Sequence, residues 1–339
     1  MSDSQYWIDH FSTVEPELRS RFAGFTVADC GAILEQRGLP RGIGEDKESA
    51  ENRVFAFEDV VLKVFRPGRW SLAALEEEVT FLEDLRAAGV AAVRPIGGIQ
   101  TWEGLHHLAY ERVARPYEED REVFTQHHVE QLVDLTVALH EVGARREATA
   151  RPRIDPRPKV EGLLTVIEGH GYLPAGLVPR YRAAVRGLAE RLEGPLQGVP
   201  QQRIHADLGS WNVLWRPEGP VAMDLDDFQV GPVALDLRLL SFPWRLDTLP
   251  AELDRKARRE QQSALVLSLY RQRRDFPEAW EALMRPLGIL RGVVFDAWFC
   301  TNWSEPGFKA HYPDDDIEGE AYWLRGIKAV EGWLEDPST

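Results

Sequence analysis

The segment that most constrains the fold of this 339-residue chain is QRIHADLGSWNVLWRPEGPVAMDLDD, residues 202–227. Its pattern is strand, loop, strand, turn and strand. Apolar residues at 213–215 and 221–223 suit two strands, and the Arg-Pro-Glu-Gly-Pro sequence between them is a strong turn signal. We therefore expect a hairpin that brings polar side chains together at its open end.

Three oxygen-bearing side chains belong to that end of the hairpin. Asn212 follows Asp207 by five residues, and Asp224 follows Asn212 by twelve. Taken singly, each is an ordinary loop residue, since Asp and Asn favour turns. Taken together, they suit kinase-type phosphoryl transfer, in which Mg²⁺ takes oxygen ligands from the protein and from ATP. We assign Asn212 and Asp224 to Mg²⁺. Asp207 would orient the acceptor hydroxyl and accept its proton late, while His205 braces the loop.

The order of predicted elements indicates two lobes, which also suits the length, since domains average about 150 residues. Strand-like runs lie at 53–57, 60–65, 95–100 and 105–110, with a helical pattern from 72 to 85 between the second and the third. Beyond residue 113 helical patterns dominate, notably at 128–140, 178–192, 251–273 and 322–334. The predicted fold class is α+β: a two-lobed, protein-kinase-like fold with a small ATP-binding lobe at 1–112, built from an antiparallel sheet and a helix, and a large helical lobe at 113–339.

Lys63 is the only Lys or Arg in the apolar run 60–65. A cation on such a strand is costly unless it is paired. Glu78, or its neighbour Glu77, lies on the following helix and is the predicted partner, in the arrangement by which kinases hold ATP phosphates. The alternative is a solvent-exposed lysine beside a solvated acidic helix face.

A phosphate-covering loop is expected just before the first strand of the small lobe. Gly42-Ile43-Gly44 lies there but lacks the GxGxxG spacing, so this motif is weak evidence. Ser49 and the backbone N–H groups beside it are the groups we expect to bond phosphate oxygens, although an ordinary turn fits the residues almost as well.

Composition narrows the range of partners and compartments. The formal net charge of −15 disfavours nucleic acid and anionic membrane. Two distant cysteines, Cys30 and Cys300, form no metal-ligand or disulfide pattern, and both are expected to be reduced and buried. No secretory signal and no apolar stretch of about 20 residues is found. We expect a soluble, cytoplasmic monomer.

Several other features have a plain structural interpretation. The Pro-rich, basic segment 151–159 is interpreted as an exposed connection, and the basic run at 255–259 as a solvated helix face. Trp70, Trp211 and Trp303 would line a cleft or, as tryptophans more often do, fill a core.

Motifs along most of the chain carry a family resemblance. They are SAENRVFAF (49–57), LKVFRPGRW (62–70), Glu77-Glu78, ALHEVG (138–143), HADLGSWNVLW (205–215), MDLDD (223–227), GPVALDL (231–237) and YWLR (322–325). With these motifs the chain resembles the stress response kinase A family, bacterial serine/threonine protein kinases related to the aminoglycoside and choline phosphotransferases.

The resemblance implies roles for individual residues. It implies Asp207 as proton acceptor, Asn212 and Asp224 as magnesium ligands, and Ser49 near ATP. It also implies that Asp236 ties the catalytic loop to a core helix. The family usually has Gly where Ala206 stands, so a positive φ at this position would strain the alanine.

The resemblance favours ATP-dependent phosphorylation of serine or threonine in a protein. A small hydroxyl-bearing molecule is the alternative acceptor, because residues 227–232 leave no room for a long activation segment. The acidic run 314–316, with Glu318 and Glu320, would then attract an amine-bearing substrate, unless it is only solvated surface. A catalytically dead nucleotide-binding scaffold is disfavoured, because Lys63 and the three hairpin residues are all present.

Overall fold

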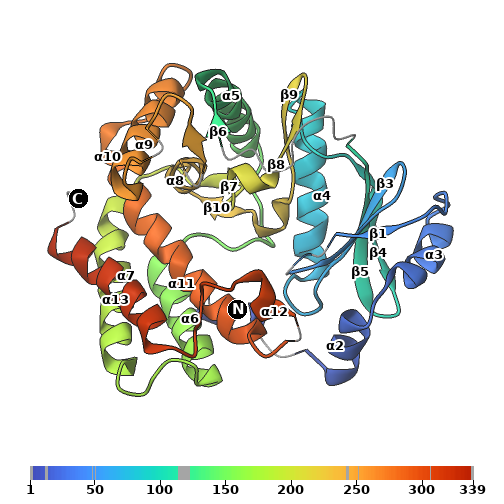
Figure 1. Cartoon of the computed structure of the whole chain (residues 1–339), viewed down its shortest axis with the longest axis horizontal. Coiled ribbons are helices and arrows are strands. Elements are labelled where there is room, and N and C mark those ends of the chain that lie inside the picture. Colours follow the sequence, from blue (N-terminus) through green and yellow to red (C-terminus); the bar gives the residue numbers. More distant parts are fainter. Residues whose placement is uncertain are drawn as a thin grey trace.

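The computed structural model describes residues 3–11, 14–47, 49, 51–113, 123–241, 244–250, 252–305 and 307–336. Figure 1 shows two lobes side by side, a smaller one built around a sheet and a larger, mostly helical one. This arrangement confirms the predicted α+β, kinase-like fold. None of the helices in the described ranges combines the length and apolar character needed to cross a membrane.

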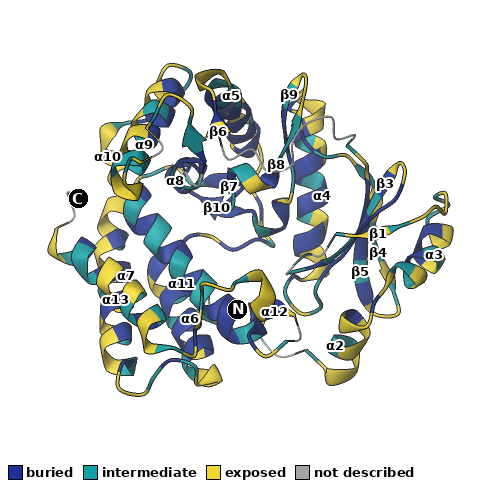
Figure 2. Ribbon diagram, viewed as in Figure 1, coloured by how far each residue is buried: buried dark blue, intermediate teal, exposed yellow. Residues whose placement is uncertain are grey.

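The small lobe is a five-stranded antiparallel sheet of order β1-β2-β3-β5-β4. Its strands are β1 (Glu45–Asp46), β2 (Arg53–Ala56), β3 (Val60–Val64), β4 (Pro95–Trp102) and β5 (Leu105–Glu111). Helix α4 (Leu72–Ala87) packs against one face, and α2 (Pro16–Ala23) and α3 (Val27–Gln36) supply apolar residues to the other. Both faces of the sheet are therefore covered, and four of the five residues of β3, Lys63 among them, are buried. Figure 2 shows the sheet beside the large lobe.

The large lobe is mostly helical and carries the predicted hairpin. Its helices are α5 (Gln126–Gly143), α6 (Pro156–His170), α7 (Val178–Leu196), α8 (Ala234–Leu240), α9 (Arg255–Arg271), α10 (Glu278–Glu281), α11 (Met284–Asn302), α12 (Phe308–His311) and α13 (Glu320–Glu335). Its strands are β6 (Val123–Phe124), β7 (Gln202–Ile204), β8 (Val213–Arg216), β9 (Gly219–Ala222), β10 (Gln229–Gly231) and β11 (Arg245–Leu246). The predicted hairpin is β8 paired with β9, and β7 pairs with β10 beside it.

The N-terminal helix α1 (Asp3–His10) packs against α6, although the sequence analysis placed residues 1–112 in the small lobe. Trp7 and Phe11 belong to the main apolar core of the large lobe. A Cβ atom at Gly162 of α6 would lie 2.5 Å from the Ser4 carbonyl oxygen, so glycine is what permits this close approach. Helix α1 therefore packs on the large lobe, although it precedes the small-lobe sheet in the sequence.

The prediction of an exposed connection at 151–159 is wrong. Pro156 opens α6, a position where its missing N–H costs nothing. Arg151 and Lys159 are each only 3% exposed. The Arg151 guanidinium lies between the rings of Trp70 and Phe228, at 4.3 and 4.2 Å from their centroids. Aromatic faces replace water around this cation, which a count of charged residues does not reveal. Cys30 and Cys300 are unpaired and buried, as predicted.

We predict that Gly143→Ala destabilises the protein by about 1–3 kcal/mol, the range of an overpacked contact. Gly143 ends α5 against β7, and an added Cβ would overlap the Arg203 carbonyl oxygen. Gly169→Ala in α6 is the matched control, because a Cβ there meets nothing within 4 Å. Denaturant unfolding measures both free energies. Equal stability of the two variants would contradict the close α5–β7 approach.

Candidate active site

The loop after β7 is held by the buried carboxylate of Asp236. This side chain accepts hydrogen bonds from the His205 and Ala206 backbone N–H groups at 2.9 and 2.7 Å, and His140 of α5 lies 3.0 Å from it. The tie between the catalytic loop and a core helix, which the resemblance implied, is confirmed. Ala206 has a φ of 63°, so an alanine occupies the strained left-handed conformation where relatives usually have glycine. The His205 ring contacts the Met223 carbonyl oxygen at 2.9 Å and so joins the two halves of the site.

Asp207 and Asn212 are in direct contact. The Asn212 amide donates to the Asp207 carbonyl oxygen at 2.9 Å and to its carboxylate at 3.0 Å. With its amide nitrogen committed to Asp207, Asn212 has its amide oxygen as the atom for binding a cation. The other Asp207 oxygen lies 3.3 Å from Arg291 of α11. These contacts fix the carboxylate in one orientation.

Asp224 faces the small lobe and pairs there with Lys63. The same ammonium lies 3.0 Å from Asp226, which also accepts a 2.8 Å hydrogen bond from Asn52. Asp224 has a φ of 60°, and its side chain is 43% exposed, whereas Asp226 is buried. The structure therefore brings Asp207, Asn212, Asp224 and Lys63 into one interlobe site, with Asp224 as the more accessible of the two carboxylates beside Lys63.

The helix glutamate does not pair directly with Lys63 as the sequence analysis expected. Glu78 is fully buried, accepts a 3.1 Å hydrogen bond from the Tyr110 hydroxyl and lies 3.6 Å from Arg151. Glu77 points elsewhere, since it caps the backbone N–H groups of residues 149 and 150. The ion pairs of Lys63 are made with carboxylates of the large lobe, because these lie closer to its ammonium.

Ser49 lies at the start of the segment that leads into β2. Its hydroxyl accepts a hydrogen bond from the Asn52 backbone N–H at 3.3 Å. Asn52 in turn bonds Asp226, so Ser49 belongs to a turn that touches the acidic group. Its neighbours Glu48 and Ala50 lie outside the described residues.

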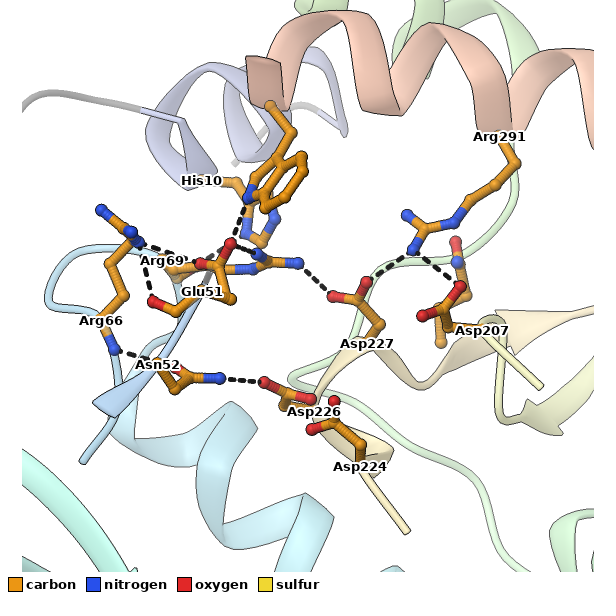
Figure 3. A network of polar contacts seen from close by, with 12 residues as sticks. His10, Glu51, Asn52, Arg66, Arg69, Asp207, Asp224, Asp226, Asp227 and Arg291 are labelled. Carbon is orange, nitrogen blue, oxygen red and sulfur yellow. Dashed lines mark hydrogen bonds and ion pairs between the residues drawn. The ribbon is translucent and has the colours of Figure 1, made fainter. Parts of the chain in front are cut away.

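A network of charges joins both lobes next to this site (Figure 3). Asp227 lies 2.7 Å from Arg291 and also pairs with Arg69 of the small lobe. Arg69 lies 2.5 Å from Glu51, whose carboxylate also accepts the indole N–H of Trp298 on α11. The segment containing Ser49 is thereby attached to the same helix that contacts Asp207.

These contacts set the ionisation of the buried groups. Burial opposes the charge on Lys63, but Asp224 and Asp226 raise the pKa of this ammonium well above its ordinary value. Burial also opposes ionisation of Asp226 and Asp227, yet Lys63 lowers the pKa of the first and Arg69 that of the second below the ordinary range. The site is thus an array of compensated charges.

Three carboxyl groups of the site are shifted in the opposite direction. Burial and the charge of Asp226 raise the pKa of Asp224 well above its ordinary value, against the lowering effect of Lys63. Burial raises the pKa of Asp207, and Arg291 limits the rise. Burial raises the pKa of Glu78 to about 7, against the lowering effect of Lys63 and Arg151. A base with a raised pKa is better matched to accepting a proton near neutral pH than an ordinary aspartate.

The donor atoms suit a divalent cation bound together with phosphates. Among the described residues, no group of three or more His, Cys, Asp or Glu side chains forms a metal cage of its own. Mg²⁺ does not require one, because it is usually bound through one or two carboxylates plus substrate oxygens. Asp224, with its partly exposed carboxylate, and the Asn212 amide oxygen match that need.

Sequence reasoning missed several residues of the site. Asp226 and Asp227 stood in the quoted MDLDD motif without a role, and Arg69 stood in KVFRPGRW. Three closely spaced acids before a strand were the available signal, since buried carboxylates need cations. Nothing local in the sequence marks Arg291 or Arg151, which reach the site only through tertiary packing.

Comparison with known proteins agrees with this geometry. Residues 43–276 match the model of the phosphotransferase enzyme family. Stress response kinase A of Salmonella typhi is 29% identical over 331 residues, covering 93% of this chain and 91% of the relative. The serine/threonine protein kinase RdoA of Salmonella typhimurium is 28% identical over 326 residues, with the same coverage. A solved structure of amicoumacin kinase with AMP-PNP and Ca²⁺ has a TM-score of 0.71 and 16% identity, covering 94% of this chain and 96% of that one.

We predict that Glu78 makes the protein less stable as the pH rises from about 4.5 to about 7. Its folded-state pKa is raised, so the stability it contributes is fully present below its unfolded pKa and is lost as the pH passes the folded value. Glu78→Gln should therefore flatten the dependence of the unfolding free energy on pH in this window. Glu76→Gln, at an exposed position of α4, should leave the slope unchanged. Parallel curves for wild type and Glu78→Gln would contradict the assignment.

Proposed function

This chain belongs to the phosphotransferase enzyme family, and we propose that it transfers the γ-phosphoryl group of Mg-ATP to a serine or threonine hydroxyl of a protein. The observation that carries the proposal is the convergence of Asp207, Asn212 and Asp224 with Lys63 between the lobes. The relatives named stress response kinase A and serine/threonine protein kinase support a protein acceptor.

Each side chain has a role in this proposal. Asn212 and Asp224 hold the magnesium ion, and Lys63 neutralises phosphate charge beside them. Ser49 and its backbone neighbours contact the phosphates, while Glu78 supports the small-lobe site from behind by holding Tyr110 and Arg151. Mg-ATP supplies the activated phosphoryl group, and amicoumacin kinase, which shares the fold, was solved with a nucleotide analogue and a divalent cation.

Asp207 performs the proton transfer. Its carboxylate orients the acceptor hydroxyl first. In a loose transition state, the proton of an alcohol becomes acidic only as the alcohol oxygen bonds to phosphorus. Burial raises the pKa of Asp207, which favours late acceptance of that proton. Arg291 and Asn212 keep the carboxylate pointed at the reaction centre.

A small hydroxyl-bearing acceptor is the second candidate. One observation favours it: a cavity of about 770 Å³ opens beside Trp211, and cavities of about 300–1,000 Å³ are typical of small-molecule sites. Transfer of labelled phosphate from ATP to generic proteins, and in parallel to small alcohols and amino sugars, separates the two candidates.

We predict that Asp207→Asn lowers the rate of phosphoryl transfer by at least about 100-fold, the usual contribution of a general base. The amide keeps the shape of the carboxylate but cannot accept the proton. Nucleotide affinity, measured by calorimetry with AMP-PNP and Mg²⁺, should change little, since Asp207 is not assigned to the nucleotide. Asp134→Asn, an exposed carboxylate on α5, is the matched control. Undiminished turnover of Asp207→Asn would refute the assignment.

We predict that Arg291→Gln lowers kcat and moves the acidic limb of the pH–rate profile to higher pH. The guanidinium opposes the rise in the pKa of Asp207 that burial causes, so its removal raises this pKa further and leaves less carboxylate at a given pH. Arg180→Gln on the exposed face of α7 serves as the control. A lower kcat with an unshifted pH–rate profile would mean that Arg291 has only a structural role.

A further inference from the structure

Arg69 lies in the loop between β3 and α4 and joins the two lobes through both arms of its guanidinium (Figure 3). One terminal nitrogen pairs with Asp227 of the large lobe, and the other lies 2.5 Å from Glu51 of the small lobe. The Arg69 side chain is only 10% exposed, so salt screens these ion pairs less than surface pairs. A planar guanidinium holds two carboxylates in a fixed geometry, which the point charge of a lysine does not.

The backbone of Arg69 is held as well. The Nδ1 atom of His10 on α1 lies 2.7 Å from the Arg69 carbonyl oxygen, and the same ring packs on Trp70 with 4.4 Å between ring centroids. Burial and the charge of Arg69 lower the pKa of His10 to about 3. The imidazole is therefore neutral near pH 7, and its Nδ1–H donates the bond to the carbonyl oxygen. Arg69 is thus fixed at its backbone and at its guanidinium.

On the large-lobe side, Asp227 is shared between two arginines. One of its oxygens pairs with Arg69, and the other lies 2.7 Å from Arg291. Arg291 lies farther from Asp207, at 3.3 Å. Without Arg69, Arg291 would be the remaining lysine or arginine within ion-pair distance of Asp227 in the part of the chain that the structure describes. Coulomb attraction would then draw its guanidinium towards Asp227 and away from Asp207.

On the small-lobe side, Glu51 belongs to the segment that contains Ser49. Arg66, from the same loop as Arg69, is bonded to this segment twice. Its backbone N–H donates to the Asn52 side-chain oxygen at 3.1 Å, and its Nε–H donates to the Glu51 carbonyl oxygen at 3.1 Å. Together with the ion pair between Arg69 and Glu51, these bonds cross-link the two segments, so that a shift of one displaces the other.

We propose that Arg69 is a positioning residue that makes the orientation of Asp207 depend on the segment expected to contact the ATP phosphates. Glu51 links Arg69 to that segment, and Asp227 links it to Arg291, which contacts Asp207. Nucleotide bound beneath the segment thus completes the arrangement of the proton acceptor before transfer. This inference rests on the proposed function.

A double-mutant cycle on the full-length protein tests the path from Arg69 to Asp207, with labelled ATP as donor and generic protein as acceptor. We expect Arg69→Gln to lower kcat about tenfold in the wild-type background but less than about twofold in Arg291→Gln, because residues that act through one contact are not additive. KM for ATP should stay nearly constant. Equal-fold losses of kcat in the two backgrounds overturn the proposal.

Arg21→Gln is the matched control for this cycle. It removes an arginine of the small lobe that is also paired with a carboxylate, Glu103, but its side chain is 43% exposed and lies on α2. It should leave kcat unchanged in both backgrounds. A loss as large as that of Arg69→Gln would mean that removing any paired small-lobe arginine slows transfer, and would also overturn the proposal.

Arg69→Lys keeps the test decisive if Arg69→Gln fails to fold, since loss of the charge leaves Asp227 and Glu51 less compensated. The lysine keeps the charge but not the fork that holds both carboxylates. We expect a melting temperature close to that of the wild type together with a several-fold lower kcat, and again a smaller loss in Arg291→Gln. Full kcat in Arg69→Lys contradicts positioning by the guanidinium.

Glu51→Gln tests the link to the phosphate-contacting segment. The amide keeps the shape of the side chain but removes the charge that holds Arg69. We expect this variant to lower kcat, and to lower it less in Arg69→Lys than in the wild type. An effect confined to KM for ATP would show that Glu51 serves nucleotide binding alone and would overturn the coupling.

The outcomes separate this inference from the proposed function. Transfer to protein with independent effects of Arg69 and Arg291 overturns the inference alone. Transfer to small hydroxyl-bearing molecules and to no protein overturns the protein acceptor, and the same cycle measured with that small molecule decides the inference. Binding of AMP-PNP with Mg²⁺ but no transfer to any acceptor overturns both.

Discussion

The active site depends on cations that pair with the carboxylates which the chain places within one turn. Asp224, Asp226 and Asp227 follow β9 almost consecutively, and all three pair with cations of the protein, although Asp224 is partly exposed. A buried carboxylate that loses its partner destabilises a protein by about 3–5 kcal/mol. These carboxylates therefore need cations from other parts of the chain. Lys63 of β3 and Arg69 of the loop before α4 are two of these cations. The two lobes are therefore joined by the same charges that would hold ATP and metal.

Helix α11 connects this charge array to one of the cavities of the large lobe. Arg291 on one side contacts both Asp207 and Asp227, while Gly288, Gly292 and Asp296 of the same helix line the cavity beside Trp211. A displacement of α11 would move the proton acceptor and the cavity wall together. The position of the Asp207 carboxylate is consequently set both by its own loop, held by Asp236, and by a contact with α11.

The sequence was sufficient to predict the two-lobed fold and the positions of its main strands, because period-two strands, helix periodicity and a strong turn signal are local properties. It was also sufficient to predict that Asp207, Asn212 and Asp224 lie at one end of a hairpin. The sequence did not predict which charged residues pair when they lie far apart along the chain. Lys63 pairs with large-lobe carboxylates rather than with Glu78, and Arg151 is buried against two aromatic rings, because the preferred partner of a buried ion depends on tertiary packing.

The contrast between global and local charge bears on how an anion such as the phosphates of ATP would be bound. With a net charge of −15, the chain repels anions at long range, but salt screens exposed charges beyond about 8 Å at physiological ionic strength. Binding must then act at contact distance, where buried cations retain their effect. Lys63, which is only 6% exposed and lies between Asp224 and Asp226, meets that condition. An acidic chain with a buried cation between its lobes would thus bind an anion by direct contact and not by long-range attraction.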